Sequence, residues 1–244
     1  ATGRRFAAAL AAAAQRGVEV ALIYDSLGSW RTGRWIFDWM AANGVKVFGY
    51  KPLAPWKRGW GWLRRDHRKQ LTVDGVTGFT GGLNIGDAWA CERDGGLAWR
   101  DTMVRMVGPA VEALDNLFRQ VWAREGRRQR FEQPLDPRPR ILPPAPPRLA
   151  GELDDAHLWI MGNREFAKRR AIRRAYRYAI ARARRSVLIS NPYFVPDHAI
   201  LRSLREARER GVRVALILPG RSDLRSVQWA SRAVFDRLLS WGIE

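Results

Sequence analysis

The chain has 244 residues, which is enough for one large domain or two modest domains with hydrophobic cores. Its formal net charge of +19 predicts an anionic partner, either lipid or nucleic acid, and does not bear on the fold. A single cysteine, Cys91, excludes an internal disulfide and a cysteine-based metal site. The three histidines, His67, His157 and His198, lie far apart without ligand spacing, which argues against a zinc site.

The start of the chain is rich in alanine and has no initiator methionine. The longest apolar run there, Phe6–Ala14, is too short to cross a bilayer, and no signal peptide is evident. Because the sequence opens inside a helical pattern, we expect the natural N-terminus to lie further upstream. A membrane anchor in a longer parent protein therefore stays open.

The first fifty residues alternate between helical and extended patterns. The patterns predict a helix at Arg4–Arg16, a strand at Val18–Tyr24, a helix at Thr32–Asn43 and a strand at Val45–Tyr50. This alternation is typical of an α/β layer fold. Residues Asp25–Ser29 follow the first strand, at the sheet edge where such folds place ligands.

The segment Lys51–Arg65 interrupts this pattern and reads as a loop, because it contains two prolines and two glycines. Trp56, Trp60 and Trp62 alternate there with lysine and arginine. Tryptophan with arginine is typical of a bilayer interface, indoles also stack on nucleobases, and the rings could instead pack beneath the loop. The segment leads directly into His67.

A hairpin follows the loop. His67–Val73 reads as a strand, Asp74 and Gly75 as a tight turn, and Val76–Thr80 as the returning strand. Side chains two positions apart share a face of a strand, so His67 and Lys69 are expected to point the same way. An imidazole beside a fixed cation suits the chemistry of a phosphate ester, as attacking group or as proton carrier.

The residues after the hairpin fit the same chemistry. Gly81 and Gly82 let the backbone approach a ligand closely, and Asn84 adds an amide donor. Together these positions resemble the His-x-Lys-x4-Asp signature of the phospholipase D superfamily. Three stretches are similar, more narrowly, to bacterial cardiolipin synthases: Gly81–Asp87, Trp99–Thr102 and Asn191–Pro196.

The resemblance implies phosphatidyl transfer through a phosphohistidine, on an anionic phospholipid such as phosphatidylglycerol. It implies no metal or organic cofactor. It also implies a membrane surface as partner, and a place at the bacterial cell membrane, either peripheral or anchored by a segment outside these residues. The oligomeric state is not set by the sequence.

The resemblance also implies roles for single residues. His67 is the nucleophile or the acid/base, while Lys69 and Asn84 hold phosphate oxygens. Asp101 resembles the acidic residue that fixes the imidazole tautomer, although it could be a surface carboxylate at a strand end. Asp74 completes the catalytic motif, but its place in the turn favours a structural role. The substrate-binding positions implied are Gly81, Gly82, Asn191 and Tyr193.

The remaining sequence predicts further strands and helices around a linker. The strands are expected at Arg100–Val107, His157–Met161, Ser186–Ser190 and Val212–Leu218; the helices at Ala110–Arg124, Arg164–Arg185, Ala199–Arg210 and Leu224–Trp241. One face of the helix expected at 164–185 carries only positive charge, from arginines. This face is either solvated or a contact for anions or a membrane. The proline-rich residues 126–150 are expected to be extended and to join two halves.

An internal repeat supports two similar halves. Seven of the eight residues of Arg16–Ile23 recur in Arg210–Ile217, and Asn43–Val45 resembles Trp241–Ile243. We therefore expect duplicated phospholipase D-like domains, each a mixed β-sheet with helices on both sides. The first spans residues 1–125, the linker 126–150, and a second, incomplete domain 151–244. The counterpart of His67 would fall near position 261, outside this chain, so the chain alone is expected to be inactive.

Two other functions stay open. The same motif cleaves phosphodiesters in nucleic acids, and a charge of +19 suits a nuclease as well. The Trp-rich loop and Trp99–Thr102 resemble the lipid branch, which makes nucleic acid the less favoured partner. With one motif only, the chain could also be a non-catalytic anion-binding module.

Overall fold

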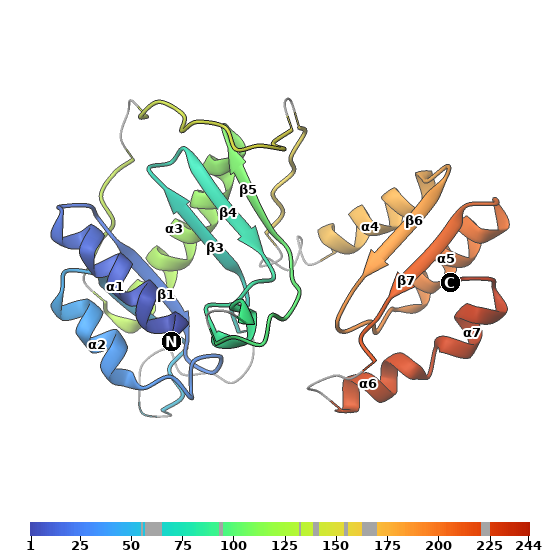
Figure 1. The fold of residues 1–244 in the computed structure, drawn as a ribbon, viewed down its shortest axis with the longest axis horizontal. Coiled ribbons are helices and arrows are strands. Elements are labelled where there is room, and N and C mark those ends of the chain that lie inside the picture. Colours follow the sequence, from blue (N-terminus) through green and yellow to red (C-terminus); the bar gives the residue numbers. More distant parts are fainter. Residues whose placement is uncertain are drawn as a thin grey trace. The chain divides into compact units, whose positions relative to one another are not determined.

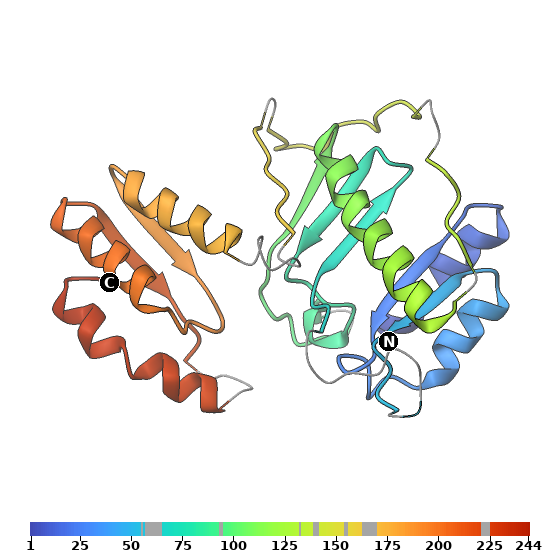
Figure 2. The same ribbon diagram turned by 180° about the vertical axis from the view of Figure 1, so that it is seen from behind.

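The computed structural model describes residues 1–54, 56, 65–92, 95–131, 133–138, 142–153, 156–162, 170–220 and 225–244. It divides into two compact units, Ala1–Ile160 and Met161–Glu244 (Figures 1 and 2). Both units combine helices with small sheets, so the α/β class predicted from the sequence is confirmed. Among the described residues, no helix is long and apolar enough to cross a membrane.

The elements follow the predicted order with shifted ends. The helices are α1 (Thr2–Gln15), α2 (Arg34–Ala42), the short 3₁₀ helix η1 (Asp87–Trp89), α3 (Ala110–Gln129), α4 (Ala171–Arg182), α5 (His198–Glu209), α6 (Arg225–Arg232) and α7 (Phe235–Ser240). The strands are β1 (Ala21–Asp25), β2 (Lys46–Tyr50), β3 (Lys69–Val73), β4 (Thr77–Gly81), β5 (Met103–Val107), β6 (Ser186–Ser190) and β7 (Arg213–Ile217).

The first unit contains two sheets. Strands β1 and β2 pair in parallel, and β3, β4 and β5 form an antiparallel sheet in that order. Helices α1 and α2 bury Ala7, Ile36 and Met40 in a core with Val45. Side chains alternate along a strand, so Phe48 points to the opposite face of the parallel pair.

Helix α3 connects the two sheets. Its first half packs Val111 and Leu114 against Met106 of β5. Further along, its Trp122 ring lies 5.9 Å from the Phe48 ring of β2, between centroids. Figure 2 shows the helix crossing the antiparallel sheet and continuing toward the parallel pair. One helix therefore fixes both sheets of the unit.

Helix α3 continues five residues beyond its predicted end at Arg124. Gly126 is buried inside it and does not break it, and Arg127 and Arg128 lie in the last turn, where cations suit the helix dipole. Arg130 has a left-handed backbone (φ 54°) and ends the helix. Residues 126–129 are therefore helical rather than part of an extended linker.

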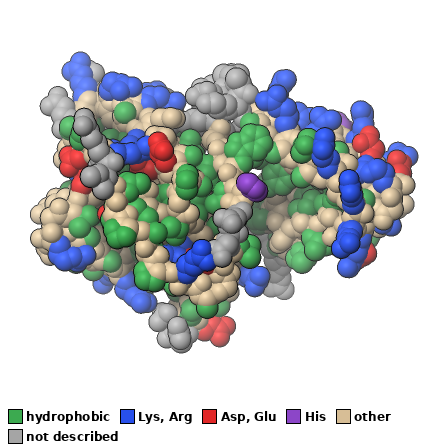
Figure 3. Space-filling view, turned by 90° about the horizontal axis from the view of Figure 1, so that it is seen from above, with side chains coloured by type: hydrophobic (Ala, Val, Ile, Leu, Met, Phe, Trp, Pro, Cys, Tyr) green, Lys and Arg blue, Asp and Glu red, His purple; other side chains and the backbone are tan. Residues whose placement is uncertain are grey.

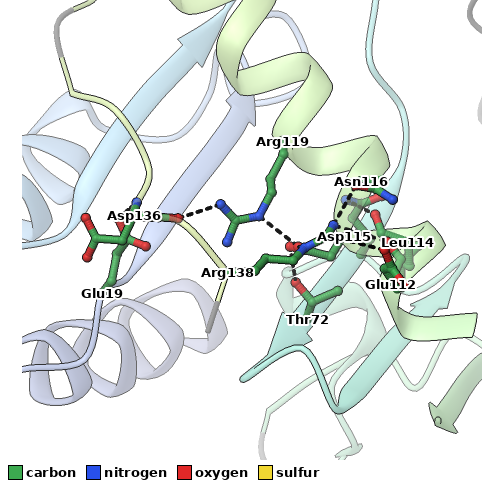
Figure 4. A network of polar contacts seen from close by, with 10 residues as sticks. Glu19, Thr72, Glu112, Leu114, Asp115, Asn116, Arg119, Asp136 and Arg138 are labelled. Atoms are coloured by element: carbon green, nitrogen blue, oxygen red, sulfur yellow. Dashed lines mark hydrogen bonds and ion pairs between the residues drawn. The ribbon is translucent and has the colours of Figure 1, made fainter. Parts of the chain in front are cut away.

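A polar network ties the chain after α3 back onto the first unit (Figure 4). The carboxylate of Asp115 on α3 accepts hydrogen bonds from Nε of Arg119 at 2.8 Å and Nε of Arg138 at 2.6 Å. The hydroxyl of Thr72 on β3 donates to the same carboxylate at 3.3 Å. Asp115 thus joins a strand, a helix and the returning segment through one buried group.

We predict that Asp115→Ala lowers the free energy of unfolding of the first unit by about 1–3 kcal/mol, because a buried acceptor of several hydrogen bonds is lost. Burial would raise the pKa of the Asp115 carboxyl, but hydrogen bonds from Arg119 and Arg138 lower it below 3.8 overall. The stabilisation is therefore present above pH 3.8 and is lost as the pH falls through the lower, folded pKa.

Denaturant unfolding of the Asp115→Ala variant between pH 3 and pH 7 measures both effects. Glu112→Ala is the matched control, since its exposed ion pair with Arg138 contributes less than about 1 kcal/mol. Equal unfolding midpoints for the two variants at pH 7 would contradict the role given to Asp115.

The second unit packs α4 and α5 on one face of the parallel pair β6–β7. Its core contains Leu201, Leu204 and Ala207 of α5. Val212, just before β7, and Val214, within β7, pack in the same core. Leu238 of α7 and Ile243 complete the core.

The two units repeat the same turn between helix and strand. Gly17 after α1 and Gly211 after α5 have φ of 88° and 82°, in the left-handed region where glycine is favoured. The amide of Val18 donates to the Ala13 carbonyl at 3.2 Å, and that of Val212 to Ala207 at 3.0 Å. The sequence repeat is thus a repeat of structure.

A second landmark repeats after the next helix. Gly44 and Gly242 have φ of 87° and 71°. The amide of Lys46 donates to the Val20 carbonyl at 2.8 Å, and that of Glu244 donates to Val214 at 3.0 Å. Glu244 therefore joins the edge of β7 in the way that β2 joins β1.

Three predicted elements of the second half differ from the structure. Residues 157–161 were expected to be a strand, but they pair with no strand among the residues that the structure describes, and Ile160 packs beside Met106 and Val111 instead. The helix expected at 224–241 is broken into α6 and α7, whose junction brings Leu238 into the core. The helix expected at 164–185 is α4, and residues 163–169 lie outside the described ranges.

Candidate active site

His67 lies two residues before β3, not inside the strand as predicted. The preceding backbone is held by Asp25, the last residue of β1. Its Oδ2 accepts the amide of Asp66 at 3.0 Å, and its Oδ1 accepts the Arg65 guanidinium at 3.0 and 3.2 Å. The side chains of Arg65 and Asp25 are 16% and 15% exposed, so this ion pair is largely shielded from water.

The same carboxylate shapes the loop after β1. The amides of Leu27 and Gly28 both donate to Asp25 Oδ1 at 2.9 Å. Asp25 thus links the end of a parallel strand to the chain that carries His67. The sequence placed Asp25–Ser29 at a ligand-binding edge, but gave no signal that its partners would be Arg65 and Asp66.

His67 and Lys69 meet as the motif predicts. Nζ of Lys69 lies 3.0 Å from Nδ1 of His67 and donates to the His67 carbonyl at 2.8 Å. Because an ammonium group only donates, Nδ1 is the acceptor, and the neutral ring carries its proton on Nε2. In this arrangement Nε2–H can donate a hydrogen bond, whereas action as an acid requires the ring to take up a second proton. Attack by Nε2 requires the ring to release Lys69 and move its proton to Nδ1.

Burial and charge keep the imidazole neutral. Burial lowers the pKa of His67 below 6.5, and the Lys69 cation lowers it further, while Asp25 and Asp66 act in the opposite direction. Burial also lowers the pKa of Lys69, against the opposing effect of Asp101, Asp25 and Asp66. Two neighbouring groups whose pKa values are both lowered by burial are typical of an active site.

Asp101 contacts the Thr102 amide and acts on Lys69 through its charge. Its Oδ1 accepts the amide of Thr102 at 2.7 Å, and its charge raises the pKa of Lys69. Among the residues that the structure describes, no hydrogen bond joins Asp101 to His67. The expected role of Asp101 in fixing the imidazole tautomer therefore stays a prediction.

The two glycines make room for the strand beside them. A Cβ on Gly82 would lie 2.0 Å from Asp101 Oδ1, and one on Gly81 would lie 2.2 Å from the Thr102 carbonyl. The sequence alone suggested close approach of a ligand. In the structure, both positions also require glycine because the Thr102 backbone and the Asp101 carboxylate approach them closely.

The other predicted residues lie at varied distances from this pair. Asn84 is half-buried, three residues past β4. Asp74 sits in the hairpin turn with φ 54°, at the far end of β3 from Lys69, roughly 16 Å along the strand. This position supports a structural role for Asp74 in the hairpin turn. It also places Asp74 far from His67 and Lys69.

Asn191 and Tyr193 belong to the second unit. The amide of Asn191 donates to the Ile217 carbonyl at 3.2 Å, and its Oδ1 accepts the amide of Tyr193 at 2.8 Å. This turn lies where β6 and β7 end. The substrate-binding role implied for both residues stays a prediction.

Most of the Trp-rich loop lies outside the described residues, including Trp60 and Trp62. Trp56 is described and is 84% exposed. A cavity of about 480 Å³ lies elsewhere, lined by Arg119 and Trp122 of α3 and by Leu135. Its lining residues are not those of the motif, so the site is defined by His67 and Lys69 rather than by this cavity.

The comparison with known families agrees with this geometry. Residues 1–122 and 176–244 match the family model described as "Cardiolipin synthase, PLD-like domain". The chain belongs to this family. The resemblance to the phospholipase D superfamily, inferred from the motif, is thereby confirmed.

The curated relatives carry the same name. The chain is 33% identical over 245 residues to a cardiolipin synthase of Geobacillus kaustophilus, covering 99% of this chain and 46% of that protein. It is 34% identical over 229 residues to cardiolipin synthase A of Pseudomonas fluorescens, covering 94% of this chain and 45% of that protein. The chain therefore spans about half the length of the curated relatives it matches.

Among solved structures, a polyphosphate kinase of Porphyromonas gingivalis aligns with a TM-score of 0.44 and 18% identity. The alignment covers 87% of this chain and 28% of that chain. A likeness at this level carries no argument about the fold or the function.

We predict that Lys69→Met raises the pKa of His67, because the neighbouring cation that opposes protonation of the ring is removed. Proton NMR titration measures this directly, since the chain has only three histidines. Lys46→Met, which breaks an ion pair with Glu19 instead, is the control and leaves the titration of His67 unchanged. An unchanged His67 titration in the Lys69 variant would refute the coupling.

Proposed function

We propose that this chain carries one half of the active site of a phosphatidyltransferase that makes cardiolipin from phosphatidylglycerol. The observation that carries the proposal is the contact of 3.0 Å between His67 Nδ1 and Lys69 Nζ within the family motif. An imidazole held beside an ammonium group suits a phosphodiester, because the cation offsets the charge that grows on the phosphate oxygens.

The proposed reaction has two balanced steps. An imidazole nitrogen attacks phosphorus of a phosphatidylglycerol, the bond from phosphorus to the glycerol oxygen breaks, and glycerol leaves with a proton. A hydroxyl of a second phosphatidylglycerol then attacks the phosphohistidine, its proton passes to the imidazole that had protonated the glycerol, the N–P bond breaks, and cardiolipin forms. Lys69 and Asn84 hold the phosphate oxygens, and Gly81, Gly82, Asn191 and Tyr193 are the proposed substrate contacts.

The two steps require a nucleophile and an acid, and therefore two imidazoles. Neither His157 nor His198 is followed by a lysine two positions later. We assign the other role to a second His-x-Lys motif, expected near position 261. His67 fills either role, and its contact with Lys69 does not decide between them.

The charge of the chain supports an anionic substrate at a membrane surface. On the face drawn in Figure 3, Lys and Arg side chains far outnumber those of Asp and Glu. The proposed place of the protein is the bacterial cell membrane, where the lipid substrate is located. The division into two phospholipase D-like domains, expected at 1–125 and 151–244, belongs to the same proposal, and the first compact unit of the structure extends to Ile160.

We predict that His67→Ala lowers phosphatidyl transfer by at least 10²–10⁴-fold in a protein extended to the length of its relatives. The assay follows glycerol release and cardiolipin formation from phosphatidylglycerol vesicles. His157→Ala is the control and retains activity. Turnover near that of the unchanged protein in the His67 variant would sink the assignment.

The same assay separates the competing functions. Cleavage of salt-matched DNA with no reaction on phosphatidylglycerol would favour the nuclease. Binding of phosphatidylglycerol without turnover, by the extended protein as well as the 244-residue chain, would favour an anion-binding module.

A further inference from the structure

Exposed indole and aliphatic side chains gather around the edge of the first unit that carries His67. Trp30, Trp35, Leu97 and Trp99 are 69%, 53%, 67% and 51% exposed. Two arginines, Arg4 and Arg31, accompany them. We call these six residues the interfacial rim.

Direct contacts join the first part of the rim. The guanidinium carbon of Arg4, in the first turn of α1, lies 5.2 Å from the Trp35 ring of α2. The corresponding atom of Arg31 lies 5.5 Å from the Trp30 ring. The loop that carries Trp30 is itself ordered by turns, with the Thr32 amide donating to the Ser29 carbonyl at 2.9 Å.

The second part of the rim follows η1 and is tied to the first. The amide of Thr2 in α1 donates to Oδ1 of Asp87 at 2.7 Å. The amide of Leu97 donates to the Asp87 carbonyl at 3.3 Å, and that of Trp99 donates to Ala88 at 2.8 Å. In Figures 1 and 2 the start of α1, the end of β1 and the segment around η1 lie together, near the N label.

The rim is also tied to the catalytic pair. The loop leading to Trp30 begins at Asp25, whose carboxylate holds the Asp66 amide immediately before His67. Trp99 precedes Asp101 by two residues, and a Cβ on Gly82 would lie 2.0 Å from the Asp101 carboxylate. The rim is therefore joined through Asp25 and Asp101 to the segments that carry His67 and Lys69.

The composition of the rim selects its partner. Indoles and arginines are typical of the headgroup region of an anionic bilayer, where the rings meet hydrocarbon and the cations meet phosphate. Indoles and guanidinium groups also stack on nucleobases, but Leu97 and the neighbouring Ile85, 53% exposed, have no flat face to stack. Arg34 in the same region is paired with Asp38 at 3.6 Å, so the rim cations are Arg4 and Arg31.

We propose that the interfacial rim docks the first unit onto an anionic bilayer, with the His67 edge facing the lipid headgroups. The docking surface is distinct from the segment 51–65, which the sequence singled out. One part of this proposal rests on the proposed function: that docking brings the lipid phosphodiester to His67. The docking itself is measured without turnover.

The first experiment measures partition of the 244-residue chain into phosphatidylcholine vesicles with and without phosphatidylglycerol. Trp30→Ala with Trp35→Ala is expected to lower partition about tenfold, because buried apolar area is lost. The matched control is Trp159→Ala with Trp229→Ala, two indoles 75% and 69% exposed outside the rim, and it leaves partition unchanged. Equal loss in both double variants would overturn the proposal.

Charge is tested in the same vesicles. Arg4→Ala and Arg31→Ala are each expected to lower partition about fivefold when phosphatidylglycerol is present, and not on neutral vesicles. Arg237→Ala on α7 removes one exposed charge elsewhere and changes partition less than twofold. Losses in DNA binding alone, with vesicle binding intact, would replace the membrane by nucleic acid as the partner and overturn the proposal.

A label tests the rim without altering it, which decides the matter if the tryptophan variants fail to fold. Cys91 is the only cysteine, is exposed, and lies between η1 and Leu97. A polarity-sensitive fluorophore on Cys91 is expected to shift to the blue on phosphatidylglycerol vesicles, whereas one on Arg237→Cys in a Cys91→Ser background is not. No shift at Cys91 during binding would overturn the docking. Docking without turnover by the protein extended to the length of its relatives would instead contradict only the proposed function.

Discussion

The carboxylate of Asp25 is the constraint on which the site depends. It closes the loop after β1 through two backbone amides, and it holds both the Arg65 guanidinium and the Asp66 amide. A group with this many partners in a largely buried position cannot move without leaving several donors unsatisfied. The position of His67 depends on these hydrogen bonds, because His67 directly follows Asp66 and only Arg68 separates it from β3.

Helix α3 holds together the two sheets of the first unit. It packs on the antiparallel sheet through Val111 and Leu114 and reaches the parallel pair through Trp122. The sheet that carries Lys69 and the sheet that ends in Asp25 are thereby held by one rigid element. The hydrogen bond from the Asp66 amide to Asp25 depends on this arrangement, since it joins the end of β1 to the chain that leads into β3. The contact between His67 and Lys69 is local, because the two residues are only two positions apart.

Sequence reasoning succeeded where a local pattern decides the structure. Alternating hydrophobicity predicted the hairpin strand, and a nearly continuous apolar run predicted the first parallel strand. The Asp74–Gly75 turn was recognised from its residue types, and the repeat was found because two glycine turns recur in order. It failed at residues 157–161, where an apolar segment packs Ile160 against a core without pairing to a strand. The hydrogen bonds of Asp25 to Arg65 and to the Asp66 amide were missed, because these partners are about forty residues away along the chain. Only the tertiary fold brings such polar groups together. The exposed rim was missed for the same reason, since periodicity alone does not distinguish a buried indole from an exposed one.

The central claim is that Asp25 positions the backbone that carries His67. Hydrogen exchange at the Asp66 amide tests it most directly, because that amide donates to Asp25 Oδ2 at 3.0 Å. We expect slow exchange at Asp66 in the unchanged chain and exchange at least about tenfold faster in Asp25→Ala. The Lys46 amide, bonded to Val20 in the parallel pair, should stay protected in both. Equal exchange at Asp66 with and without the Asp25 carboxylate would contradict the account.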